Sequence, residues 1–178
     1  MKNDKLIILV EAALLAALTC VATMIIRVPT IGTNGYVNIG DAMVLVSAFL
    51  LGNPFGALAA GIGSGLADLF AGYGSYVPGT TIIKFLMAFV ASILYNLISK
   101  TKLNKIGGYI ISAIVAELIM VFGYFFYEST FLGYGIAAAA SIVSNMIQGV
   151  TCLVIGVVLI NTLNGTRYFK NQFMAKNK

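Results

Sequence analysis

Six polar side chains interrupt the apolar segments of this sequence, in a pattern that suits hydrogen bonding and charge pairing. They are Asp68, Lys84, Glu117, Ser141, Asn145 and Gln148. A polar group in an apolar environment is costly, so each is a candidate for contact with a ligand or with a polar partner on a neighbouring helix. The chain has no histidine, and its two cysteines, Cys20 and Cys152, stand far apart. We therefore expect no metal site and no catalytic residue.

The charged candidates each have two interpretations. Asp68 and Lys84 lie on either side of a short turn-rich segment, residues 72–79. They can form a salt bridge with each other, and one or both can also face a ligand. Glu117 lies near the middle of its apolar segment, where it is either protonated and bonded to a neighbouring helix or part of a pocket floor.

The amide and hydroxyl candidates fall on one helical face. Ser141, Asn145 and Gln148 follow one another at spacings of four and three residues. Their donors and acceptors can bind the rim of a heterocycle, and the small residues just before them leave room for a ring. The alternative is that they bond neighbouring helices together.

The composition predicts an integral membrane protein. Of the 178 residues, 60% are hydrophobic and 10% are charged, and the mean hydropathy is +0.96. Soluble domains do not have this composition. The formal charge of +5 comes from loops and tails that would face anionic lipid, so we expect no nucleic-acid partner.

The apolar segments predict an all-α membrane protein, a single domain over residues 1–178 with six transmembrane helices. A span needs about 20 apolar residues. We expect the helices at about 6–26, 40–52, 54–71, 80–99, 107–126 and 136–163. Gly52-Asn53-Pro54 divides the second from the third. Residues 27–38 form the longest loop, and Thr80 and Thr81 are expected to cap the fourth helix.

Basic residues are concentrated at one side of these helices. Nine of the eleven are Lys2, Lys5, Lys100, Lys102, Lys105, Arg167, Lys170, Lys176 and Lys178. Positive charge is retained on the cytoplasmic side, so both termini are expected there. The outer pocket would then be formed by the late parts of helices one, three and five and the early parts of helices two, four and six.

Tyrosines gather at the predicted outer face. Six of the nine are Tyr36, Tyr73, Tyr76, Tyr124, Tyr127 and Tyr134. Most are expected to form an interfacial belt, and some can stack on a flat ligand. Tyr36 and Asn38 in the first outer loop, and Tyr76 in the second, are therefore candidate binding residues, with the first loop as a lid. Arg27 beside it is expected to anchor at the interface.

Small residues form stripes on two of the helices. The first helix has Ala12, Ala13, Ala16 and Ala17. The third has Gly52, Gly56, Ala60, Ser64 and Asp68 at intervals of four. Such stripes allow close helix contact. They serve either packing within the chain or association with another subunit.

The chain combines six predicted helices and the alanines of the first helix with the stretches GYVNIGDAMVLVSAFLLGNPFGALAAGIGSGLADL and YVPGTTIIK. In this combination it resembles the S component of an energy-coupling factor (ECF) vitamin transporter, in the riboflavin-transporter-like branch. The resemblance implies binding of a vitamin from outside the cell membrane of a bacterium. It also implies docking on a membrane coupling subunit that carries two ATPase subunits, with Ala12, Ala13, Ala16 and Ala17 at that contact. The pocket would lie between helices four, five and six.

No GxxxxGK[ST] phosphate-binding loop occurs in the chain. We therefore expect no cofactor in this chain, and ATP would be used by the partner subunits. A stand-alone secondary transporter or channel is the alternative, and an intramembrane enzyme the third. The substrate stays open among riboflavin, hydroxymethylpyrimidine and pyridoxine-like heterocycles.

Overall fold

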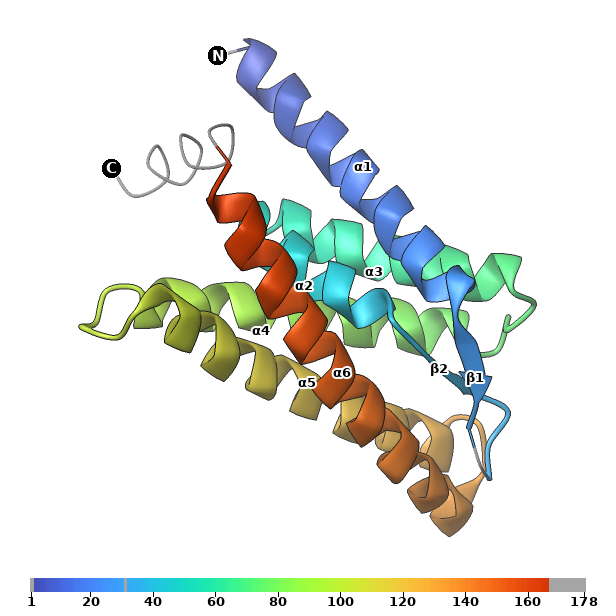
Figure 1. Ribbon diagram of the computed structural model, residues 1–178. Helices are drawn as coiled ribbons and strands as arrows, with labels where there is room; N and C mark the ends of the chain where they lie inside the picture. The colour runs from blue at the N-terminus through green and yellow to red at the C-terminus, as the bar shows by residue number, and fades with distance from the viewer. Residues whose placement is uncertain (1, 31, 167–178) are drawn as a thin grey trace.

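The computed structural model describes residues 2–30 and 32–166, and within them the chain is almost entirely helical (Figure 1). Its α-helices are α1 Lys2–Ile25, α2 Gly40–Leu50, α3 Phe55–Phe70, α4 Val77–Ile98, α5 Lys105–Thr130 and α6 Ala139–Asn164. A short 3-10 helix, η1 Gly135–Ala138, leads into α6. The predicted all-α fold with six helices is confirmed for the described residues.

Four helical segments are long and apolar enough to cross a membrane. They are Lys5–Ile25, Val77–Ile98, Lys105–Thr130 and Gly135–Asn164. The apolar helices α2 and α3 have 11 and 16 residues. At about 1.5 Å per residue, α2 is roughly 16 Å long, about half the hydrocarbon thickness. It is joined to α3 by a tight turn in which Gly52 has a φ of 68°.

The first predicted loop contains secondary structure that the sequence analysis missed. Strand β1, Arg27–Pro29, pairs antiparallel with β2, Tyr36–Asn38. Val28, Tyr36 and Val37 suit strands because branched and aromatic side chains fit an extended, half-buried surface. In Figure 1 the two strands lie across one end of the helices, which we call the hairpin end.

Two helix boundaries differ from those predicted. The helix α4 begins at Val77, with proline in its first turn, so Thr80 and Thr81 are not caps. The Thr81 hydroxyl instead donates to the Val77 carbonyl at 2.7 Å. The helix α5 continues to Thr130. Glu128, expected in a loop, therefore lies in its last turn and is only 2% exposed.

The small residues of α3 allow its neighbours to pack closely within the chain. A Cβ atom on Gly56, which belongs to the stripe, would overlap the backbone of Ser47 in α2. Beside the stripe, a Cβ atom on Gly63 would overlap the backbone of Ala16 in α1, and one on Gly65 would overlap Thr81 of α4. The α3 stripe therefore serves intramolecular packing, which was one of its two interpretations.

Apart from Arg27 and Lys84, the described basic residues lie away from the hairpin end. Lys100 and Lys102 belong to the α4–α5 turn, at the opposite end of the helices (Figure 1), and Lys5 is in the first turns of α1. Arg167, Lys170, Lys176 and Lys178 lie outside the described residues. This distribution supports the proposal that the hairpin end faces outward.

Candidate binding site

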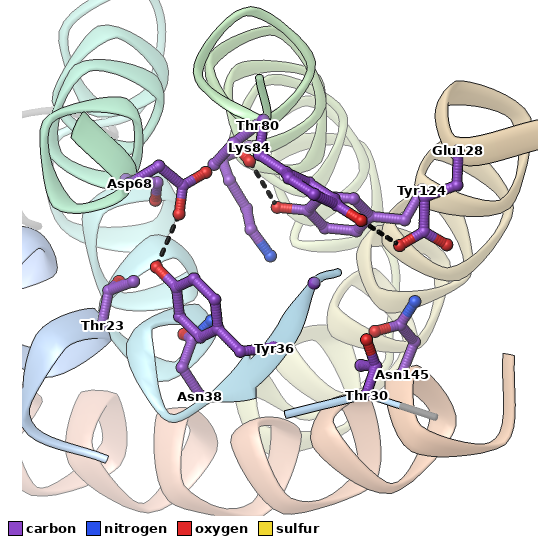
Figure 2. A pocket seen from close by; sticks show the side chains of 13 residues that line it. Thr23, Thr30, Tyr36, Asn38, Asp68, Thr80, Lys84, Tyr124, Glu128 and Asn145 are labelled. Carbon is purple, nitrogen blue, oxygen red and sulfur yellow. Dashed lines mark hydrogen bonds between the residues drawn. The ribbon is translucent and has the colours of Figure 1, made fainter. Parts of the chain in front are cut away.

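A polar pocket lies at the hairpin end, between the β-hairpin and helices α1, α3, α4, α5 and α6 (Figure 2). Six residues that the sequence singled out line it: Tyr36, Asn38, Asp68, Tyr76, Lys84 and Asn145. They lie in the outer loops and helix ends where the distribution of basic residues predicted the pocket. The exception is α2, which supplies no lining residue. The free space is about 20 Å³, room for about one water molecule.

Asp68 of α3 and Tyr36 of β2 join the hairpin to the helices. The Tyr36 hydroxyl donates to Oδ1 of Asp68 at 2.5 Å. Burial, followed by the negative charge of Asp68, raises the pKa of the Tyr36 phenol above its usual value. Tyr36 is therefore a hydrogen-bond donor at neutral pH. Because the free space is about 20 Å³, a ring-sized ligand requires lining side chains such as Tyr36 to move outward.

The predicted salt bridge between Lys84 and Asp68 is wrong. The Lys84 ammonium instead pairs with Oδ1 of Asp41 in α2 at 2.5 Å, and both side chains are buried. Asp41 is a near neighbour because α2 packs against α4 inside the bundle. The ammonium also lies 5.1 Å from the centre of the Tyr124 ring. Lys84 is thus fixed beside the pocket by a partner behind it.

Gln148 of α6 also bonds to Asp41, on the side away from the pocket. Its amide nitrogen donates to the second oxygen of Asp41 at 2.5 Å. Its amide oxygen accepts the backbone N–H of Asn38 at 2.6 Å. Gln148 therefore connects α6 with α2 and β2, and it does not line the pocket. Of its two interpretations, bonding of neighbouring helices describes these contacts.

Glu128 of α5 forms the opposite side of the pocket. Its Oε1 accepts the Tyr76 hydroxyl at 3.0 Å, and its Oε2 accepts the Ser141 hydroxyl at 2.5 Å. Burial, followed by the charge of Glu128, raises the pKa of the Tyr76 phenol. Ser141 lies behind Glu128 and outside the lining. Asn145, one turn along α6, does line the pocket and is 4% exposed.

Glu117 is not among the residues that line the pocket. Its side chain packs against Gly149 of α6, and neither carboxyl oxygen has a hydrogen-bond partner within residues 2–30 and 32–166. The predicted bond to a neighbouring helix is therefore wrong, and Glu117 forms no part of the pocket lining.

Six other side chains line the pocket and were not chosen from the sequence as binding residues. They are Thr23, Thr30, Ser64, Thr80, Tyr124 and Glu128. Thr80 and Tyr124 share a hydrogen bond of 3.0 Å, whereas the buried Ser64 hydroxyl has no partner. Threonine and serine are common in membrane helices, so their sequence signal is weak. Glu128, a carboxylate next to an apolar helix, was the one recognisable signal.

Tyrosines at the hairpin end contact one another as well as the pocket. The ring centres of Tyr36 and Tyr73 are 4.5 Å apart, and the Tyr127 hydroxyl donates to the Ser75 carbonyl at 2.7 Å. These contacts connect residues around the pocket rim. Some of the tyrosines that were expected to form an interfacial belt therefore pack against one another.

The four alanines of α1 divide between two environments. Ala12 and Ala16 are half-buried and pack against the core. Ala13 and Ala17 are exposed. Only the second pair is free to meet another protein without disturbing α3.

Comparisons with known proteins identify the family of this chain and a similar fold. Residues 3–165 match the family model described as "ECF-type riboflavin transporter, S component". A protein from Pyrococcus woesei, described as an uncharacterized protein in gap 3'region, is 32% identical over 136 residues, covering 76% of this chain and 87% of that protein. A solved structure, described as "Structure and mechanism of the S component of a bacterial ECF transporter", has a TM-score of 0.64 at 22% identity. It covers 92% of this chain and 96% of that one.

Proposed function

Because this chain belongs to the ECF-type riboflavin transporter S component family, we propose that its polar pocket captures a vitamin or vitamin precursor. The chain is a multi-pass protein of the cell membrane and a transport subunit, not an enzyme. Riboflavin, hydroxymethylpyrimidine and pyridoxine-like heterocycles are the proposed substrates. The observation that carries this proposal is the convergence of Asp68, Lys84, Glu128 and Asn145 on one pocket.

The chemistry of the pocket supports a recognition role. Hydroxyl, amide, carboxylate and ammonium groups converge from helices far apart in the sequence. A few convergent polar groups orient a small ligand and determine its specificity. We assign direct binding to Tyr36, Asn38, Asp68, Tyr76, Lys84 and Asn145. Ser141 positions Glu128, and Gln148 positions Asp41 and Asn38.

S components work with an ECF energy-coupling module, whose ATPases supply the energy. For this chain we propose a membrane coupling subunit with two ATPase subunits as the partners. The exposed side of α1 that carries Ala13 and Ala17 is the proposed contact. Small side chains there allow a partner helix to approach closely. Ala12 and Ala16 support that surface from beneath by packing against the core.

Two measurements test this function. Calorimetry with the purified full chain in nanodiscs, without ATP, should detect binding of at least one compound among riboflavin, hydroxymethylpyrimidine and pyridoxine. Liposomes containing the chain alone should show no uptake of that compound, and addition of the coupling module with ATP should start it. Uptake by the chain alone would favour a secondary transporter or channel instead.

A further inference from the structure

The charges around the pocket are unequal. Four charged side chains are buried in its wall or directly behind it: Asp41, Asp68, Lys84 and Glu128. Three are acidic and one is basic. Arg27, the other basic residue of the hairpin end, is exposed on β1. The wall therefore contains more acidic than basic side chains.

The single buried cation is already neutralised. Lys84 lies 2.5 Å from Asp41, and Asp41 is not a lining residue. An ammonium group has three N–H donors, so Lys84 can also donate to an acceptor in the pocket. Lys84 contributes a donor there without adding net positive charge to the group.

The other two carboxylates have no cation. Asp68 accepts a hydrogen bond from Tyr36, and Glu128 accepts from Tyr76 and Ser141. No ion pair joins either carboxylate to a cation among residues 2–30 and 32–166. In Figure 2 they stand on opposite sides of the pocket, with the Lys84 amine between them. Buried charges without a partner are costly and are stabilised by an opposite charge.

One hydroxyl and one amide in the pocket lining make no hydrogen bond with another described residue. The Ser64 hydroxyl, 1% exposed, has no partner among the described residues. The Asn145 amide, 4% exposed, makes no hydrogen bond with another described residue. These groups are independent of the acidic pair, and they also point to a ligand because buried polar groups are normally satisfied.

We infer that the pocket selects a small heterocycle that is cationic or carries an amino group, and discriminates against anionic compounds. The positive or N–H groups of the ligand would face Asp68 and Glu128, and an acceptor such as a ring nitrogen or hydroxyl would face Lys84. This inference rests on the proposed binding role of the pocket.

The test compares compounds of one size and different charge, with the full chain in nanodiscs at pH 7. One series is nicotinate, nicotinamide and 1-methylnicotinamide, and the other is 4-pyridoxate, pyridoxine and pyridoxamine, with hydroxymethylpyrimidine and riboflavin added. The cationic or amino member of a series should bind at least about tenfold more tightly than the anionic member, the difference expected of one charge-assisted hydrogen bond.

Variants assign the preference to the two carboxylates. Asp68→Asn and Glu128→Gln keep the shape and the acceptor oxygen, and each should weaken binding of the cationic compound about tenfold while reducing its advantage over the neutral one. Glu117→Gln is the matched control because Glu117 is buried but does not line the pocket. Its affinities should change much less than those of the two lining variants. Thermal unfolding in the same nanodiscs identifies any variant that fails to fold.

The outcomes separate the inference from the function on which it rests. Tighter binding of the anionic member of a series by the wild-type chain overturns the charge inference and leaves the vitamin-binding function standing. A cation preference that persists in both folded variants also overturns it. Absence of binding by every compound, in a chain that unfolds cooperatively, overturns both.

Discussion

The Lys84 ammonium and the Asp41 carboxylate are 2.5 Å apart, although they come from α4 and α2. Both side chains are almost completely buried. The second oxygen of Asp41 accepts from Gln148, so the pair also connects α6. The ion pair and the Gln148 hydrogen bond thus connect α4, α2 and α6 directly behind the proposed ligand pocket.

Loss of one member of this pair should be more damaging than loss of both. Lys84→Met leaves a buried carboxylate without its cation, and Asp41→Asn leaves a buried ammonium without its anion. Each should lower the free energy of unfolding by about 3–5 kcal/mol. The double variant should recover much of that loss. Denaturant unfolding in detergent measures all three, and a double variant as unstable as the sum of the singles would contradict the pairing.

The hydroxyl of Tyr36 should hold the hairpin on the helices. Tyr36→Phe removes the bond to Asp68 and should destabilise the closed position of β2 by about 1 kcal/mol. Hydrogen–deuterium exchange should then become faster at the amides of residues 27–38. Tyr73→Phe is the control, since Tyr73 contacts Tyr36 through its ring and its hydroxyl bonds no other described residue. Equal exchange in both variants would show that the hydroxyl has no such role.

The two alanine pairs of α1 should behave differently. Ala13→Leu and Ala17→Leu together should spare ligand binding but reduce ATP-driven uptake at least about tenfold, since crowding a close contact costs roughly 1–3 kcal/mol. Ala16→Leu should instead lower the melting temperature because Ala16 packs inside the bundle. Uptake assays with the reconstituted coupling module measure the first effect. Normal uptake by the double variant would exclude this side of α1 as the docking surface.

The α2–α3 hairpin should tolerate no side chain at Gly56. A Cβ atom there would overlap the backbone of Ser47, so Gly56→Ala should lower the free energy of unfolding by about 1–3 kcal/mol. Gly74→Ala is the control, because nothing lies within 4 Å of its Cβ position. Thermal unfolding of the two variants should differ clearly. Similar melting temperatures would mean that α2 and α3 can move apart at Gly56 with little loss of stability.

Much of the fold was predictable because hydropathy and turn residues are local signals. The six helices and the break at Gly52-Asn53-Pro54 were predicted correctly. The strands β1 and β2 were missed, since three residues each provide too short a pattern. The start of α4 was placed three residues late because Thr80 and Thr81 suit a cap, whereas Pro78 suits the first turn of a helix.

The candidate site was predictable in position but only partly in its bonds. Tyr36, Asp68, Lys84 and Asn145 do line one pocket, as expected from their places near one end of the helices. Glu117 has no bonded partner, and Gln148 faces Asp41. These details depend on helix rotation, which polar residues spaced along a nearly uniform apolar helix specify poorly.

The sequence by itself determined the membrane class, the helix order and the residue block that carries the family resemblance, since each depends on composition or on contiguous residues. Only the tertiary structure decided that Lys84 pairs with Asp41 and that Asp68 and Glu128 stay without a cation. It also decided that Ala13 and Ala17, but not Ala12 and Ala16, are exposed. These outcomes depend on how α1, α2 and α4 approach their neighbours, and close packing of distant segments sets distances that spacing along the chain does not contain.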